Sequence, residues 1–275
     1  MKTRAITGLF FIVIMLASLF LGEQVFVWFY VALGGACMHE FYSLHREQVS
    51  ATQRHLGFAL GLLGLVLVAT IFLSWLPAGF LSLVLLFPII ILLSQLFQPS
   101  TGRPFEQVSN VMAGWMYAGI PFACFLGLGM RPEELGAHIG GYSFSFVLPL
   151  GLLLLIWAND TGAYILGRAF GKHKLYERIS PGKTWEGFVG GLVSTLVVSS
   201  VLFRQFETLS LTQWLAIAVI VSVMGTLGDL VESMLKRNLG IKDSGTILPG
   251  HGGFLDRFDS LLFAAPCVYL LLYLS

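Results

Sequence analysis

Carboxylates near the ends of apolar segments are the residues of this sequence best suited to chemistry. Asp229 lies near the end of one such segment, in the run Gly225 to Arg237. In a helix, with about 100° per residue, Asp229, Ser233 and Lys236 share one face. Glu232 lies at the border of that face, so one stripe offers carboxylate, hydroxyl and ammonium groups. The simpler interpretation is an Asp–Lys pair that stabilises a helix end.

A second pair of carboxylates opens the last apolar segment. Asp256 and Asp259 stand three residues apart, and therefore on one helical face, just after Gly252 and Gly253. Glycines before a helix permit a turn whose N–H groups face an anion. Carboxylates at span ends, without cysteine or suitably spaced histidine, suit a hard cation, and Mg²⁺ is the expected ion. The cations nearby in the sequence are Lys236, Arg237, Lys242, His251 and Arg257. A carboxylate-bound metal among cations is the usual setting of polyphosphate chemistry.

Another polar cluster lies earlier in the chain. It contains Asn159, Asp160 and Tyr164, followed by two loop segments rich in Lys, Arg and Gly, 167–174 and 180–187. Asp160 is suited to completing the metal site or to holding a nucleotide hydroxyl. Lys183, in the second loop segment, is suited to phosphate. The alternative is a basic loop that is attracted to anionic lipid.

Two short motif matches are discounted. Gly182-Lys183-Thr184 has the form of the end of a P-loop, but the earlier glycine that this loop needs would stand at Glu177. His39-Glu40 begins a zinc-protease pattern whose second histidine would stand at Ser43. Neither segment is therefore assigned that chemistry.

The elements that position these residues are expected to be membrane spans. Charged residues make up 11% of the 275 residues, against about 25% in a soluble domain, and hydrophobic residues make up 56%. Too little polar surface exists to cover a water-soluble globule, and the apolar excess excludes disorder. Each of the three cysteines lies in an apolar run, which favours neither disulfides nor a structural zinc site. The net charge of +1 predicts no general attraction to nucleic acid.

Nine segments reach the roughly 20 apolar residues, about 17 at the least, that a bilayer span needs. They lie near 5–22, 24–44, 56–76, 79–97, 108–130, 144–165, 187–203, 212–235 and 254–274. The predicted fold is therefore an all-α, polytopic integral membrane protein. Residues 1–143 would form an N-terminal part of about five spans, and residues 144–275 a catalytic part of about four. The charged residues are concentrated in this second part.

Lys and Arg are distributed unequally between the two predicted sides of the membrane. If the N-terminus is cytoplasmic, thirteen of the sixteen lie on that side, and only Arg131 and Arg204 lie on the other. The sixteenth, Arg257, lies at the start of the last span. Positive charge marks cytoplasmic loops. The N-terminus and the loops 166–186 and 236–253 are therefore predicted to be cytoplasmic.

The run of 27 residues from Ser233 to Asp259 resembles the signature of the phosphatidate cytidylyltransferases, also called CDP-diacylglycerol synthases. The segments Asn159–Tyr164 and Ser180–Gly187 are also similar to that family, so the similarity covers about 159–259. The N-terminal part resembles the family only in that it consists of several apolar spans. The fixed elements of the signature stand here as Ser233, Lys236, Arg237, Lys242, Asp243, Pro249, His251, Gly252, Gly253, Asp256, Arg257 and Asp259.

The resemblance implies transfer of a cytidylyl group from CTP to phosphatidate, giving CDP-diacylglycerol and pyrophosphate. It implies a homodimeric enzyme of a bacterial inner membrane with its active site on the cytoplasmic side. Mg²⁺ would be held by Asp229 and Asp256, with Asp259 and Asp160 as further candidates. The implied catalytic residues are Asp229, Ser233, Lys236, Arg237, His251, Asp256 and Arg257. The implied substrate-binding residues are Asn159, Asp160, Tyr164, Lys183, Lys242, Asp243, Gly252 and Gly253.

Two other functions stay open on the sequence. A CTP-dependent polyprenol or lipid kinase would need a base to activate a hydroxyl group, and the full signature match argues against it. A secondary transporter would hold its substrate near the membrane midplane between repeated halves. The acids here lie at span ends in one unrepeated part of the chain.

Overall fold

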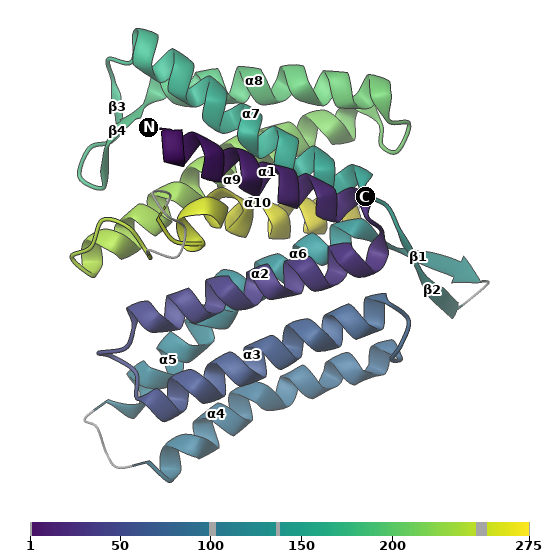
Figure 1. Ribbon diagram of the computed structural model, residues 1–275, viewed down its shortest axis with the longest axis vertical. Coiled ribbons are helices and arrows are strands. Elements are labelled where there is room, and N and C mark those ends of the chain that lie inside the picture. Colours follow the sequence, from purple (N-terminus) through teal and green to yellow (C-terminus); the bar gives the residue numbers. More distant parts are fainter. Residues whose placement is uncertain (1, 99–102, 136–137, 246–251, 275) are drawn as a thin grey trace. The chain divides into compact units, whose positions relative to one another are not determined.

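The computed structural model describes residues 2–98, 103–135, 138–245 and 252–274. Within these ranges the strands are limited to two short hairpins, and the other regular elements are helices (Figure 1). The prediction of an all-α fold is confirmed. The helices before the first hairpin are α1 (Lys2–Phe20), α2 (Glu23–Leu44), α3 (Ala51–Phe72), the 3₁₀-helix η1 (Ala78–Leu85), α4 (Leu86–Leu96), α5 (Pro104–Gly114), the π-helix η2 (Trp115–Gly119) and α6 (Ile120–Gly129). The later helices are α7 (Val147–Phe170), α8 (Trp185–Gln205), α9 (Leu211–Asn238) and α10 (Leu255–Leu274).

Eight helical segments in the described part of the chain are long and apolar enough to cross a membrane, which confirms a polytopic membrane protein. They correspond to the second through ninth predicted spans. The first predicted span, 5–22, coincides with α1, whose described apolar part, Phe10–Phe20, is shorter than a span requires. The count of nine and the side of the N-terminus stay predictions.

Prolines explain where two of these segments leave α-helical geometry. The span predicted at 79–97 begins as η1, and α4 starts at Leu86, so that Pro88 falls in its first turn. An N–H group there has no partner within the helix, so a proline costs little. The span predicted at 108–130 starts earlier, with Pro104 in the first turn of α5. It contains the π-helical turn Trp115–Gly119 just before Pro121.

The two hairpins are both antiparallel and were not predicted from the sequence. The first joins β1 (Met130–Leu135) to β2 (His138–Phe144). The second joins β3 (Lys174–Tyr176) to β4 (Ser180–Thr184), inside the segment expected to be a loop. Thr184 ends β4 and also caps α8, because its hydroxyl accepts the N–H of Gly187 at 3.1 Å. One residue therefore fixes the hairpin to the next helix.

The chain divides into two compact units. The first contains Met1–Ser145 together with Ser244–Leu255, and the second contains Phe146–Asp243 together with Asp256–Ser275. The middle of the signature run therefore belongs to the first unit, while the carboxylates on both sides of it belong to the second. The core of the first unit includes the buried rings of Phe26, Tyr30 and Phe125, with the last two centred 4.6 Å apart.

In the second unit, α7 and α8 pack side by side through glycines (Figure 1). A Cβ atom on Gly190 would lie 2.7 Å from the carbonyl oxygen of Gly162 and 2.6 Å from the Cβ of Leu166. Only a residue without a side chain permits this approach of the two backbones. The next helix, α9, begins with a capping box in which Ser210 and Gln213 satisfy each other's backbone N–H groups.

Candidate active site

A cavity of about 420 Å³ lies within the second unit and gathers residues from six of its elements. Asn159, Asp160 and Tyr164 come from α7, Lys183 from β4, and Asp229 from α9. All five were predicted from the sequence. The other lining residues are Ala163, Gly167, Arg168, Leu175, Gly182, Thr184, Gly187, Phe188, Gly225, Thr226 and Ser260. Residues from two separate sequence clusters therefore share one pocket.

The α7 residues of the cavity differ in their exposure. Asn159 is buried, whereas Asp160 is exposed and Tyr164 is 64% exposed. The hydroxyl of Tyr164 accepts a hydrogen bond of 2.9 Å from the guanidinium of Arg168, one helical turn later. The cavity wall thus includes a cation, Arg168, that the sequence analysis did not assign.

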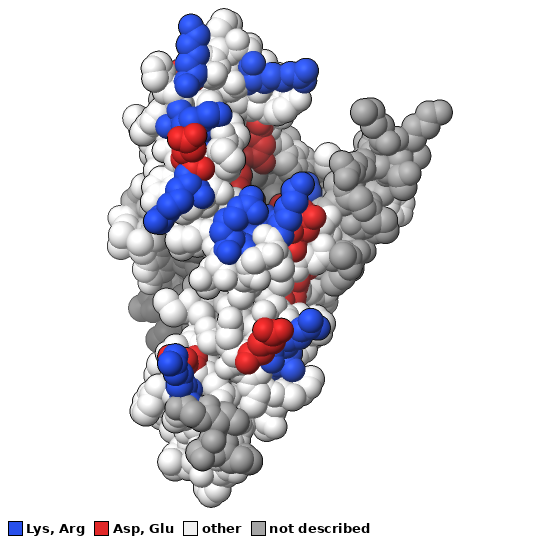
Figure 2. Space-filling model, turned by 90° about the vertical axis from the view of Figure 1, so that its left-hand side faces the viewer, with Lys and Arg blue, Asp and Glu red and all other residues white. Residues whose placement is uncertain are grey.

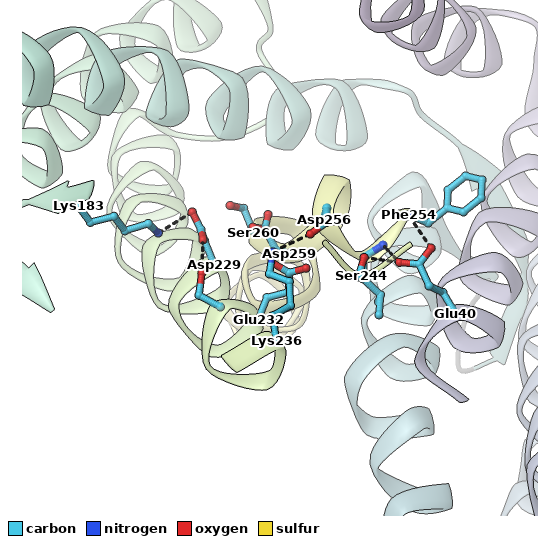
Figure 3. Close-up of polar contacts among 12 residues, drawn as sticks. Glu40, Lys183, Asp229, Glu232, Lys236, Ser244, Phe254, Asp256, Asp259 and Ser260 are labelled. Carbon is cyan, nitrogen blue, oxygen red and sulfur yellow. Dashed lines mark hydrogen bonds and ion pairs between the residues drawn. The ribbon is translucent and has the colours of Figure 1, made fainter. Parts of the chain in front are cut away.

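Lys183 and Asp229 form an ion pair at the cavity wall. The Lys183 Nζ atom lies 2.6 Å from Oδ2 of Asp229 (Figure 3). It also donates a hydrogen bond of 3.3 Å to the carbonyl oxygen of Thr226. The other carboxylate oxygen of Asp229 accepts a hydrogen bond of 3.3 Å from the hydroxyl of Ser233. Asp229 and Ser233 therefore share one face of α9, as the spacing predicted. Lys183, from β4, adds an ammonium group to that face.

Three carboxylates come together beside this pair. One oxygen from each of Asp229, Glu232 and Asp259 lies within 4.8 Å of the others. Glu232 is 1% exposed, although the sequence placed it only at the border of the reactive face. Clustered carboxylate oxygens are the ligands that hard divalent cations prefer. This donor set fits a metal ion.

Lys236 lies between two carboxylates of the second unit, one of them in the cluster just described. Its Nζ atom is 2.6 Å from Oε2 of Glu232 and 2.6 Å from Oδ1 of Asp256. Asp256 is thus bound by Lys236. The cluster of three carboxylates contains Glu232 and does not contain Asp256. A metal role for Asp256 stays a prediction.

The charges of this set do not balance. With Asp160 and Arg257, whose charges act on the same groups, the set holds five carboxylates, those of Asp160, Asp229, Glu232, Asp256 and Asp259, against the three cations of Lys183, Lys236 and Arg257, an excess of two negative charges if all are ionised. Partly buried like charges are unfavourable unless a cation compensates them. One divalent cation would offset this excess. On the face that Figure 2 displays, Lys and Arg side chains lie with acidic side chains among them, surrounded by uncharged residues.

The remaining predicted residues of the second unit do not line the cavity, although the charge of one of them, Arg257, acts on Asp160. Arg237, at the end of α9, and Lys242, Asp243 and Arg257 are exposed. Gly252 and Gly253 belong to the first unit, where Gly253 lies against Glu40. His251 lies outside the described residues. The roles assigned to these residues stay predictions.

The sequence patterns did not lead to a functional role for three residues that the structure places in polar clusters, Arg168, Glu232 and Glu40. Arg168 stands four residues after Tyr164, a spacing that places two side chains on one helical face. Glu232 stands three residues after Asp229 and three before Leu235 on the adjoining stripe. Glu40 was considered only as part of a failed zinc motif, although an acid inside an apolar span is itself a functional signal.

Comparison with known proteins agrees with the resemblance of the signature run. The sequence model of the cytidylyltransferase family matches residues 2–275. The chain is 34% identical over 282 residues to the phosphatidate cytidylyltransferase of Bacillus subtilis, an alignment that covers 100% of this chain and 98% of the relative. It is 35% identical over 278 residues to the enzyme of the same name from Staphylococcus haemolyticus, with 99% of each chain covered. The chain therefore belongs to the cytidylyltransferase family.

Proposed function

We propose that this protein transfers a cytidylyl group from CTP to phosphatidate, giving CDP-diacylglycerol and pyrophosphate, at the cavity of the second unit. The observation that carries the proposal is that Asp229 belongs both to the ion pair with Lys183 at the cavity wall and to the cluster of carboxylates with Glu232 and Asp259. Family membership and the full-length similarity to proteins named phosphatidate cytidylyltransferase support it.

The reaction depends more on the alignment of the two substrates than on the activation of the nucleophile by a protein base. A phosphate oxygen of phosphatidate, already ionised at neutral pH, forms a bond to the α-phosphorus of CTP, while the bond from that phosphorus to the β-phosphate oxygen breaks and its electrons leave with pyrophosphate. No protein base has to remove a proton, so Ser233 acts as a hydrogen-bond donor to Asp229. Lys183, Arg168 and Tyr164 line the cavity at positions suited to phosphate and ribose oxygens.

We assign Asp229, Glu232 and Asp259 as the carboxylates that would hold Mg²⁺, and the sequence resemblance adds Asp256. A bound Mg²⁺ ion would neutralise charge on the phosphates and favour the departure of pyrophosphate. Lys236 restrains Glu232 and Asp256 in fixed positions through its two ion pairs. Arg237, Lys242, His251 and Arg257 are proposed to contact the outer phosphates, as the signature implies.

The location of the reaction follows from the substrates. Phosphatidate lies in the leaflet with its phosphate at the interface, and CTP is soluble, so we propose that the cavity is reached from the interface, where both substrates can enter. The relatives are bacterial proteins and the chain has multiple apolar helices. We therefore propose a bacterial inner membrane, an active site on the cytoplasmic side, and a homodimer as the family resemblance implies.

Pyrophosphate release by the purified protein in mixed phosphatidate micelles tests the activity. CTP, dCTP, ATP and GTP are supplied in turn with Mg²⁺, and the lipid product is identified by mass spectrometry. Pyrophosphate formed in equal amount with CDP-diacylglycerol, only when phosphatidate and a cytidine nucleotide are both present, is expected. Formation of CDP and a phosphorylated lipid alcohol would instead indicate a lipid kinase, and absence of any turnover would contradict an enzymatic function.

A further inference from the structure

Glu40 is a buried carboxylate near the C-terminal end of α2, in the first unit, and only 4% of its surface is exposed. It belongs to none of the clusters described above. A buried carboxylate is unfavourable unless it is paired or hydrogen-bonded. The groups that donate hydrogen bonds to Glu40 therefore indicate its structural role.

Those partners come from one segment of the first unit, Ser244–Leu255. The hydroxyl of Ser244 donates to Oε1 of Glu40, as does the backbone N–H of Leu255 at 3.1 Å, and the N–H of Phe254 donates to Oε2 at 2.8 Å (Figure 3). Both carboxylate oxygens thus accept hydrogen bonds. A carboxylate with charge-assisted bonds of this kind is held firmly in place.

The glycines of the segment make room for this carboxylate. A Cβ atom on Gly253 would collide with Oε1 of Glu40, and one on Gly245 would lie 2.9 Å from Oε2. Gly252 has φ +80°, a conformation that other residues rarely adopt. The sequence predicted that N–H groups after these glycines face an anion. In the structure that anion is the protein's own Glu40.

We propose that Glu40 is a positioning residue for the active site, a role that rests on the proposed function. Leu255 is the first residue of α10, and Asp256 follows it directly. The first N–H groups of a helix lack partners within the helix, so an external carboxylate that accepts them fixes where the helix starts. Glu40 thereby fixes the backbone from which Asp256 and, one turn later, Asp259 project.

The size of the expected effect follows from the tolerance of catalytic geometry. A displacement of about 1 Å in a reacting group costs on the order of a hundredfold in rate. Glu40→Gln keeps the shape of the side chain but replaces one accepting oxygen with an NH₂ group that faces a donor. We expect kcat to fall by about tenfold to a hundredfold, while KM for CTP changes by less than about threefold.

The experiment compares purified wild-type protein, Glu40→Gln, Ser244→Ala and Glu47→Gln. Glu47 is an exposed carboxylate in the connection after α2, and its variant controls for the loss of one charge. Steady-state kinetics are measured with CTP and phosphatidate. A second readout needs no activity: the rise in thermal unfolding midpoint with increasing Mg²⁺. Glu40→Gln should need about tenfold more Mg²⁺ for half of the rise, on the basis that misplaced carboxylates bind metal less well. Ser244→Ala should shift both readouts in the same direction by less, and Glu47→Gln should match the wild type.

Three results would overturn the proposal. A lower KM for CTP in Glu40→Gln would mean that Glu40 competes with a substrate phosphate. An unchanged Mg²⁺ requirement, with activity lost only in proportion to unfolded protein, would mean that Glu40 is merely structural. If Glu40→Gln does not fold, wild-type behaviour of Ser244→Ala in both readouts would count against the role. Failure of the wild type to form CDP-diacylglycerol would instead remove the proposed function, and the Mg²⁺ readout would still test the positioning of α10.

Discussion

The ammonium group of Lys183, on a β-hairpin, lies 2.6 Å from the carboxylate of Asp229, on helix α9. The pair joins the two polar clusters of the sequence at one cavity. Lys183 has a second contact, to the carbonyl oxygen of Thr226, so it is held from two points on α9. Its position beside the cavity makes it the first side chain to test.

Lys183→Met removes the positive charge and keeps most of the side-chain length. We expect the KM for CTP to rise about tenfold or more, with a fall in kcat, because charged hydrogen bonds to phosphate are worth roughly 1.5–3 kcal/mol. Steady-state kinetics would measure both. Lys174→Met, on the neighbouring strand where Nζ donates to the Pro181 carbonyl, is the matched control. Equal impairment of the two variants would indicate damage to the hairpin instead.

Glu232→Gln tests the carboxylate cluster. The change removes one charge from three carboxylates whose oxygens lie within 4.8 Å of one another, so metal affinity should fall and turnover should drop by several orders of magnitude. Mg²⁺ titration followed by calorimetry measures the affinity directly. Glu186→Gln, whose carboxylate pairs with His173, should leave it unchanged. Asp256→Asn, measured in the same way, shows whether Asp256 also binds the ion. Wild-type affinity in Glu232→Gln would remove Glu232 from the metal site.

Gly190→Ala tests the contact between α7 and α8. The added methyl group would lie 2.7 Å from the Gly162 carbonyl oxygen, and such overpacking typically costs about 1–3 kcal/mol. We expect a lower thermal unfolding midpoint in detergent. Gly79→Ala, where no atom lies within 4 Å of the added group, should keep the wild-type midpoint. A similar midpoint for both variants would show that the helices can separate without penalty.

Single cysteines test the predicted orientation. In a background without Cys37, Cys124 and Cys267, cysteines at the exposed positions Lys174 and Arg204 should be labelled from opposite sides of the membrane. A cysteine at Lys2 should be labelled from the same side as the one at Lys174 if α1 crosses the bilayer. Impermeant maleimide on intact and opened cells provides the measurement. Labelling of Lys174 and Arg204 from one side would contradict the crossing of α8.

Hydrophobicity and proline positions were sufficient to locate eight of the helical segments, because a bilayer span requires a long apolar run whatever the tertiary structure. They could not predict the β3–β4 hairpin. Its strands are only Lys174–Tyr176 and Ser180–Thr184, and they read as a basic loop. They gain order from contacts such as the Thr184 cap on α8, which is a tertiary property.

The site was predictable to the extent that its residues share a helix. The stripe of Asp229, Ser233 and Lys236 followed from helical spacing alone, and the Ser233–Asp229 contact bears out that geometry. Glu232, on α9, and Asp259, on α10, lie in one carboxylate cluster because of how the two helices pack. Residue spacing within a single helix cannot predict that packing. The pairing of Glu40 with Phe254 and Leu255 joins residues more than 200 positions apart, and no local pattern could indicate it.

That last pairing also bears on how the protein is made. A ribosome synthesises Glu40 long before Leu255, since 215 positions separate them. During that interval α2 enters the bilayer with a carboxylate whose partners do not yet exist. The nascent chain must therefore keep this group hydrated or shielded by the insertion machinery. The first unit receives its second segment, Ser244–Leu255, only after Phe146–Asp243 of the second unit has been synthesised, so the first unit cannot complete its fold before most of the second unit exists.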